Sequence, residues 1–247
     1  MQDNRRMKLQ IEADAIGVGR ESARWVAAAI RNHPRLTLAL PTGSSPLSMY
    51  AELVRLNRED DLDFSNVRVF SLDEYLGLAE SDPRSFRHYL WARFLGLINV
   101  RPANVLLAPS NGNGGDDYEQ AIRAAGGIDL LIAGLGANGH IAFNEPGSSF
   151  ESRTRCVELA ESTLAGMRFH FAEAELPKQA MTMGVATILE ARQVVMLVIG
   201  EAKQESLHRM LEGPISEAMP ASAMRLHGDV TIFADQSAWG TARIGPW

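Results

Sequence analysis

The stretch Ile128–Pro146, IDLLIAGLGANGHIAFNEP, decides the fold of this chain. It opens with a nearly continuous apolar run, which is typical of a strand buried on both faces of a parallel sheet. The glycines that follow let the backbone turn tightly and let a ligand approach the main chain. His140, Asn144 and Glu145 come next, on the loop that leaves the carboxyl end of the strand, where open α/β sheets bind their ligands. The stretch therefore predicts a parallel α/β sheet and a ligand site at its edge.

The same glycines allow a second interpretation. Gly134, Gly136 and Gly139 spell the dinucleotide-binding pattern G-x-G-x-x-G, and Glu158 follows at about the distance of a ribose-binding acid. That pattern needs a long helix directly after the last glycine, and Pro146 to Ser149 interrupts the chain only seven residues later. A dinucleotide site is therefore the weaker hypothesis.

Composition predicts one domain that spans residues 1–247. The chain has 247 residues, of which 46% are hydrophobic and 22% charged, so it can bury a large core with at most a small lid. A single cysteine, Cys156, leaves no intramolecular disulfide and fits a reducing compartment. No run approaches 18 apolar residues and the first ten residues do not resemble a signal peptide, so we expect a cytoplasmic protein without a membrane partner.

The net charge of −6 predicts no nucleic-acid partner, because lysines and arginines are scattered along the chain. An anionic ligand would need a local cradle.

Apolar and amphipathic segments alternate along the chain, as expected for strands and helices of an α/β protein. The expected strands are Met7–Asp14, Leu36–Leu40, Val67–Leu72, Asn104–Leu107, the run from Ile128, Val194–Ile199 and Val230–Ala234. The expected helices are Glu21–Asn32, one from Leu47, Ser81–Phe94, Tyr118–Ala125, Met181–Glu190 and Gln204–Leu211. Residues 160–176 are polar with interspersed apolar side chains, the composition of a mobile lid over a site.

The turn between the second expected strand and the next helix, PTGSSP from Pro41 to Pro46, has the composition of a phosphate cradle. Thr42, Gly43 and Ser44 would offer backbone N–H groups and hydroxyls where the helix dipole is positive. The alternative is simple capping, with Ser45 as N-cap and Pro46 in the first helical position.

Charged residues stand after two other strands. Asp73 and Glu74 end the third expected strand, where they form either a solvated turn or the mount of a general base. Lys203 follows a later strand, and Arg168 lies in the expected lid, from which it could reach an anion.

Four strand ends, PTGSS, DEY, GLGANGH and GEAK, meet at one edge if the sheet is parallel. Taken alone, His140 could be a core histidine and Glu145 a solvated acid. Together the strand ends predict an anion cradle, a carboxylate base and a histidine with polar neighbours. No metal-binding spacing or activated nucleophile is present. The set suits proton transfer on a phosphorylated small molecule, without a metal or other cofactor.

Several motifs also resemble one family closely. LPTGSSP, SLDEYLGL, GLGANGHIAFNEPGSSFESRTR, PKQAMTMGVATIL and GEAKQESLHRMLEG are similar to the glucosamine-6-phosphate deaminases, and the similarity covers almost the full chain. The resemblance implies a doubly wound, mostly parallel, Rossmann-like sheet with helices on both faces. It also implies conversion of glucosamine 6-phosphate and water to fructose 6-phosphate and ammonia.

The resemblance assigns roles to residues of this chain. Asp73 would carry a proton from C2 to C1, and His140, supported by Asn138 and Glu145, would open the sugar ring. The groups that would hold the phosphate are Thr42, Gly43, Ser44, Arg168 and Lys203.

Departures from the family pattern bear on regulation. Many members carry Asp where this chain has Asn138, so a neutral amide would orient His140. Members activated by N-acetylglucosamine 6-phosphate carry a basic residue at the position of Val157 and have a longer C-terminus. We therefore expect no allosteric hexamer, but a monomer or small homo-oligomer.

Three alternatives stay open. Galactosamine 6-phosphate could be the substrate, although the SRTR run at Ser152 to Arg155 favours glucosamine. A 6-phosphogluconolactonase would lack the FNEP element. An inactive sugar-phosphate sensor would not need Asp73, His140 and Glu145.

Overall fold

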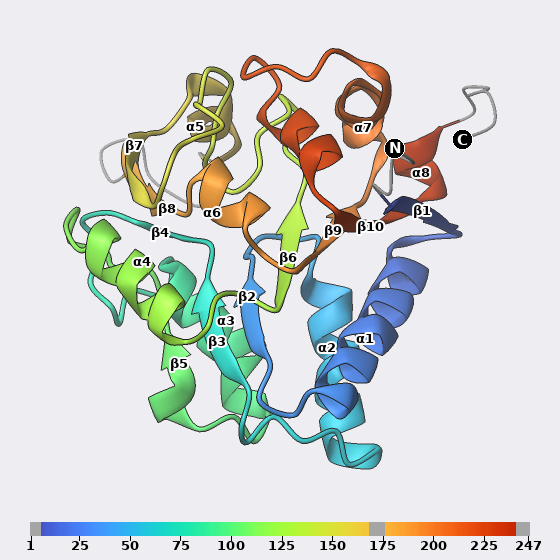
Figure 1. Ribbon diagram of the computed structural model, residues 1–247, viewed down its shortest axis with the longest axis vertical. Helices are drawn as coiled ribbons and strands as arrows, with labels where there is room; N and C mark the ends of the chain where they lie inside the picture. The colour runs from blue at the N-terminus through green and yellow to red at the C-terminus, as the bar shows by residue number, and fades with distance from the viewer. Residues whose placement is uncertain (1–5, 168–175, 241–247) are drawn as a thin grey trace.

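A parallel sheet of seven strands forms the centre of this computed structural model, which describes residues 6–167 and 176–240 (Figure 1). Every neighbouring pair in the sheet is parallel, as the non-alternating apolar strands predicted. In spatial order the strands are β1 (Arg6–Glu12), β10 (Asp229–Asp235), β9 (Gln193–Val198), β6 (Leu130–Gly134), β2 (Thr37–Leu40), β3 (Arg68–Ser71) and β5 (Val105–Leu106).

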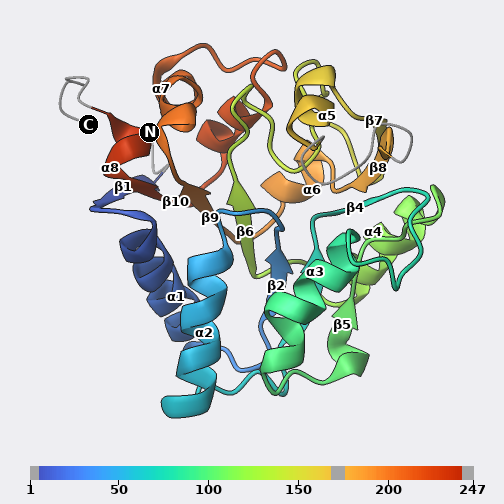
Figure 2. The same cartoon turned by 180° about the vertical axis from the view of Figure 1, so that it is seen from behind.

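Helices cover both faces of this sheet (Figures 1 and 2). One face carries α1 (Ala15–Asn32), α2 (Leu47–Glu59) and α3 (Phe86–Arg93), and the other carries α4 (Gly115–Ala124), α6 (Val185–Leu189), α7 (Gln204–Glu212) and α8 (Gln236–Trp239). The doubly wound α/β fold is thereby confirmed. No helix in the described ranges combines the length and apolar character that crossing a membrane requires.

Strand β6 shows why both faces need helices. Its residues Leu130 and Ile132 pack into the core with α1, α2 and α3, whereas Leu131 and Ala133 pack into the core on the opposite face. All four are fully buried. Because successive side chains of a strand point to opposite faces, a strand covered on both sides must be apolar at every position.

The order in which the chain adds strands to the sheet reverses between β2 and β6. From β2 the chain runs outward through β3 to β5, and it then returns to β6 on the other side of β2. Ligands of open α/β sheets bind in the crevice at such a switch point, outside the carboxyl ends of the strands. The fold thus places a crevice between the ends of β2 and β6.

A second, antiparallel sheet was not foreseen. It consists of β4 (Asp73–Tyr75), β8 (Gln179–Thr182) and β7 (Arg155–Glu158). The predicted helix Met181–Glu190 is therefore wrong in its first part. Met181 pairs with both neighbouring strands, and the helix starts only after Gly184, where an added Cβ would lie 2.0 Å from the carbonyl oxygen of Ser152. Pairing of Met181 with two strands distant in sequence has thus prevailed over the helical pattern of its own segment.

The predicted start of one further helix is also wrong. The segment expected as Ser81–Phe94 becomes helical only at Phe86, with Ser85 as N-cap. The Asp82 carboxylate accepts the Arg84 N–H at 2.9 Å and so holds a turn where the helix was expected. Helix α2 begins at Leu47 as predicted. The capping alternative is wrong, because Pro46 stands before the first helical residue and no side chain, that of Ser45 included, caps this helix.

The remaining short elements connect the layers. They are α5 (Glu161–Met167) and the 3₁₀ turns Leu95–Leu97, Pro102–Asn104, Glu201–Lys203 and Pro220–Leu226. Helix α5 forms the first part of the expected lid at 160–176, and residues 168–175 of that segment lie outside the described residues.

Tyr118 ties α4 to the end of β3. Its hydroxyl donates to the Ser71 carbonyl at 2.7 Å and accepts the Ser71 N–H at 3.0 Å, and both residues are buried. Replacing Tyr118→Phe leaves these two backbone groups without their partner. We expect the free energy of unfolding in urea to fall by about 1–3 kcal/mol. A change below about 0.5 kcal/mol would show that these bonds are replaced at no cost.

Candidate functional site

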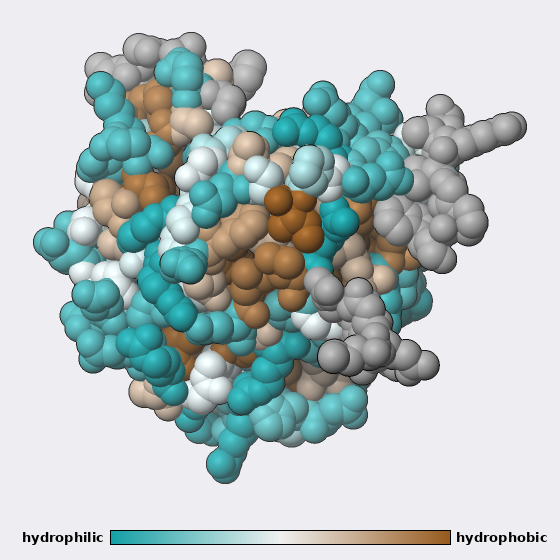
Figure 3. All heavy atoms as spheres, turned by 45° about the horizontal axis from the view of Figure 1, so that its top comes forward, coloured by the Kyte–Doolittle hydropathy of each residue, from teal (hydrophilic) through white to brown (hydrophobic). Residues whose placement is uncertain are grey.

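A cavity of about 710 Å³ lies at the carboxyl edge of the parallel sheet. Its lining comes from the ends of all four strands singled out in the sequence, β2, β3, β6 and β9, and from α3. In a space-filling view of this edge, apolar residues gather in the middle of the face and polar residues surround them (Figure 3). The strand ends that the sequence analysis grouped therefore share one pocket.

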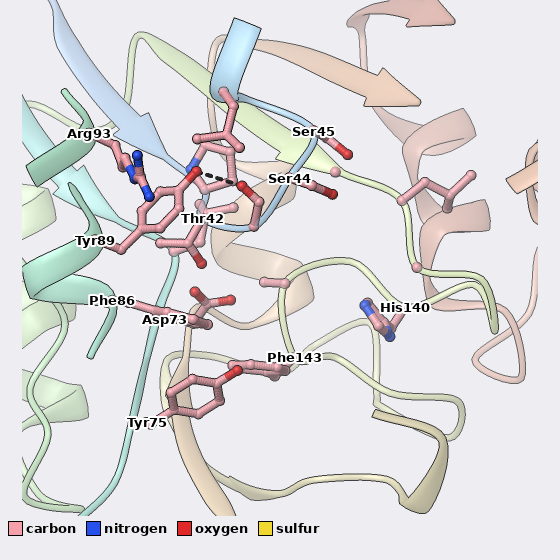
Figure 4. A pocket seen from close by; sticks show the side chains of 18 of the residues that line it. Thr42, Ser44, Ser45, Asp73, Tyr75, Phe86, Tyr89, Arg93, His140 and Phe143 are labelled. Atoms are coloured by element: carbon pink, nitrogen blue, oxygen red, sulfur yellow. Dashed lines mark hydrogen bonds between the residues drawn. The ribbon is translucent and has the colours of Figure 1, made fainter. Parts of the chain in front are cut away.

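Asp73 projects its carboxylate into this cavity from the start of β4 (Figure 4). Asp73 is only 7% exposed to solvent. Burial, with a smaller contribution from the charge of Glu74, raises the pKa of Asp73 to about 8. A carboxyl group with such a pKa can both take and return a proton near neutral pH.

Glu74 is a structural support that sequence reasoning did not assign. Its carboxylate accepts the backbone N–H groups of Tyr75 at 2.8 Å, Phe86 at 2.9 Å and Arg87 at 2.7 Å. Burial raises the pKa of Glu74, and these three donors oppose that rise without cancelling it. Glu74 thus fastens the first turn of α3 to β4 and keeps a second acid beside Asp73.

His140 lines the opposite side of the cavity from Asp73 (Figure 4). Its Nδ1 lies 3.3 Å from Oε2 of Glu145, although the contact is not aligned as a hydrogen bond. Asn138 connects the two: its Nδ2 donates to the same Oε2 at 2.7 Å, and its Oδ1 accepts the His140 N–H at 3.1 Å. Asn138 and Glu145 do not line the cavity, but both contact His140, which does.

Glu145 is held in its ionised form. Burial would raise its pKa, but the contact with His140 and the hydrogen bonds from Thr163 and Asn138 lower it overall. Thr163 belongs to α5, and its hydroxyl donates to Oε1. Sequence spacing gave no sign of Thr163, since only the tertiary fold brings α5 to Glu145.

The predicted anion cradle lies at the same cavity. Thr42, Gly43, Ser44 and Lys203 all line it. Gly43 has a φ of +89°, which an L-residue with a side chain rarely adopts. Lys203 is partly buried, and burial lowers its pKa. The remaining predicted phosphate ligand, Arg168, lies outside the described residues.

Helix α3 supplies a wall that the sequence analysis missed. Phe86, Tyr89 and Arg93 line the cavity from one side of this helix. The ring of Phe86 contacts that of Tyr75 with 4.3 Å between centroids, and Phe143 stacks beside it at 5.9 Å. The spacing of 86, 89 and 93 was a usable signal, because residues three and four apart share a helix face.

The dinucleotide hypothesis is wrong. After Gly139 the chain forms turns and a short bridge, and the next helix begins only at Glu161. Without a helix at that position no N-terminal dipole faces the glycine turn. In the described ranges no group of three or more His, Cys, Asp or Glu is arranged to hold a metal ion.

Comparison with known proteins points to a family of sugar-phosphate enzymes. A family model described as glucosamine-6-phosphate isomerases/6-phosphogluconolactonase matches residues 12–233. A glucosamine-6-phosphate deaminase from Thermoanaerobacter sp. (strain X514) is 39% identical over 239 residues, which cover 94% of each protein.

Solved structures give the same result. That of a monomeric glucosamine-6-phosphate deaminase superposes with a TM-score of 0.91 at 38% identity, over 94% of this chain and 98% of the other. A 6-phosphogluconolactonase from Leishmania guyanensis shares the fold, with a TM-score of 0.76 at 19% identity over 97% of this chain and 100% of the other. The chain therefore belongs to the family of glucosamine-6-phosphate isomerases and 6-phosphogluconolactonases.

Proposed function

We propose that this chain is an enzyme that converts glucosamine 6-phosphate and water to fructose 6-phosphate and ammonia. The observation that carries the proposal is one cavity with a carboxylic acid on one side, a histidine on the other and an anion cradle between strand ends. Relatives about 40% identical over most of the chain bear the name of this activity, which supports it.

Ring opening is the task of His140. An imidazole can accept the proton of the sugar O1 hydroxyl and deliver a proton to the ring oxygen, so that the C1–O5 bond breaks and C1 becomes an aldehyde. The imidazolium formed on the way is stabilised by the ionised Glu145 at 3.3 Å. Asn138 keeps that carboxylate in place through its 2.7 Å hydrogen bond.

Asp73 then carries out the isomerisation. Its carboxylate removes the proton from C2, which is acidic because it lies beside the C1 carbonyl; O1 takes up a proton from water, and an enolamine with a hydroxyl group on C1 forms. The same carboxyl group returns the proton to C1 and the nitrogen releases a proton to water, which leaves an imine at C2. Water adds to this imine, and ammonia departs as the C2 ketone of fructose 6-phosphate forms.

The phosphate lies at Thr42, Gly43, Ser44 and Lys203 in this proposal, with Arg168 as a further cation. An anion bound at a turn before a helix is stabilised by backbone N–H groups and by the helix dipole. In the partly buried surroundings of Lys203 a phosphate would also restore the favourable charged state of the ammonium group.

The alternative activities are those of related proteins. A lactonase is less well supported, because the lactonase from Leishmania guyanensis is 19% identical to this chain whereas the deaminase of known structure is 38% identical. Galactosamine 6-phosphate would use the same machinery. For assembly, that deaminase is monomeric, which favours a monomer or small homo-oligomer here.

Replacing Asp73→Asn tests the base. We expect ammonia release from glucosamine 6-phosphate to fall by about 10²–10⁴ or more, because an amide cannot take the C2 proton. The affinity for the sugar phosphate, measured by calorimetry, should stay close to that of the wild type.

The same ammonia assay separates the alternatives. Galactosamine 6-phosphate is run beside glucosamine 6-phosphate, and hydrolysis of 6-phosphogluconolactone is followed separately. Full activity of the Asp73→Asn variant would refute the assigned base. Absence of ammonia from both amino sugars with the wild type would refute the proposed function.

Replacing Glu74→Gln tests the electrostatics of Asp73. Ionisation of Asp73 makes the base, so kcat/KM should rise with pH up to about 8 in the wild type. Burial is the larger cause of the raised pKa and Glu74 the smaller one. Removing the Glu74 charge should therefore move the rising limb to lower pH without abolishing it.

Glu80→Gln is the matched control for this experiment. Glu80 lies in the same segment with a 71% exposed side chain, so its charge is screened by solvent. Its loss should leave the pH profile of kcat/KM unchanged. A Glu74→Gln profile that coincides with that of the wild type would contradict the assigned coupling.

A further inference from the structure

Tyr89 makes a short hydrogen bond to the loop at the anion cradle. Its hydroxyl donates to the carbonyl oxygen of Gly43 at 2.5 Å (Figure 4). Burial raises the pKa of this phenol to about 12, against a smaller opposing effect of Arg93, so the donor keeps its proton throughout the neutral range.

The bond fixes the orientation of one peptide group. The C=O of Gly43 and the N–H of Ser44 belong to the same peptide unit, and in a trans peptide they point in opposite directions. No cis peptide occurs in the described part of the chain. Because Tyr89 holds the carbonyl on its own side of the loop, the Ser44 N–H must point to the other side.

That other side carries the side chains of Ser44 and Ser45, both of which line the cavity. In Figure 4 the side chains of Ser44 and Ser45 extend from the loop away from Tyr89. Gly43 has no side chain that could fix this peptide, and no atom lies within 4 Å of the place where its Cβ would be. Its backbone, at a φ of +89°, therefore needs a partner such as Tyr89 to hold the peptide. Another tyrosine supports the start of the same loop, where the Tyr50 hydroxyl donates to the Pro41 carbonyl at 2.6 Å.

Tyr89 also connects the cradle to the base. It stands on α3, whose first turn is bound by Glu74, and Glu74 is the sequence neighbour of Asp73. A continuous path of hydrogen bonds and helix therefore runs from β4 to the Gly43 carbonyl. Such a path sets the distance between the site of proton transfer and the site of anion binding.

We propose that Tyr89 is a positioning residue for phosphate binding, which it serves by holding the Gly43–Ser44 peptide with its N–H directed into the cradle. The proposal deepens the proposed function and rests on it for the identity of the phosphorylated substrate. Tyr89 does not contact the reacting carbons in this arrangement. Its loss should weaken binding and leave the chemistry of bound substrate nearly unchanged.

The test replaces Tyr89→Phe in the whole chain, which keeps the ring and removes the hydroxyl. Calorimetry with inorganic phosphate should give a Kd about three- to tenfold higher than that of the wild type, the loss expected for one neutral hydrogen bond. With glucosamine 6-phosphate, KM should rise by a similar factor while kcat stays within about twofold. The rising limb of the pH profile of kcat/KM should not move, because Asp73 is untouched.

Tyr118→Phe serves as the matched control, because it removes another buried tyrosine hydroxyl away from the cradle. It should lower stability without changing the Kd for phosphate. If both variants weaken phosphate binding equally, the effect is general destabilisation and the proposal is overturned. A Tyr89→Phe Kd and KM equal to those of the wild type would overturn it as well.

The phosphate measurement keeps the two hypotheses separate. If the wild type binds inorganic phosphate, Tyr89→Phe binds it more weakly, and no amino sugar releases ammonia, the proposed function fails and the role of Tyr89 at an anion site stands. If the wild type releases ammonia but Tyr89→Phe leaves phosphate binding and KM unchanged, the proposed function stands and the role of Tyr89 fails.

Discussion

The parallel register of four adjacent strands is the constraint on which the site depends. β9, β6, β2 and β3 lie side by side and run in the same direction, so their carboxyl ends share one edge. Each end carries a different part of the proposed site: Lys203, His140, the PTGSS turn and Asp73. If one strand ran antiparallel, its loop would lie at the opposite edge of the sheet. The buried apolar strands that stabilise the fold therefore also assemble the site.

The pKa values of two carboxyl groups of the site are shifted in opposite directions. Asp73 is buried beside another acid, and its pKa is raised to about 8. Glu145 receives hydrogen bonds from Thr163 and Asn138 and the contact with His140, and its pKa is lowered. Environments that separate the pKa values of two acids assign different roles to them. Asp73 is suited to exchange a proton, and Glu145 is suited to remain charged and stabilise an imidazolium.

The supports of the site come from elements outside the parallel sheet. Strand β4 carries Asp73 and Glu74 in the small antiparallel sheet, where Asp73 pairs with Thr182. Glu74 fixes the start of α3, and α3 brings Tyr89 to the cradle. Helix α5 contacts Glu145 through Thr163. Helices and strands hold binding groups in more precise positions than loops do.

The sequence by itself determined the fold class and most of the predicted site. Non-alternating apolar runs such as the one from Ile128 are typical of strands covered on both faces, and glycine or acidic turns directly after them mark the binding edge. The local sequence also placed Thr42, Asp73, His140 and Lys203 after strand ends, and the structure brings them to one cavity.

Only the tertiary structure decided the supports. The strand at Met181, the start of α3 at Phe86, and the contacts made by Glu74, Tyr89 and Thr163 all depend on partners distant in sequence. A single sequence records which residues favour a helix or strand nearby, but not which distant backbone groups a buried carboxylate or hydroxyl will find. Those partners exist only once the sheet has brought them together, and so does the burial that raises the pKa of Asp73.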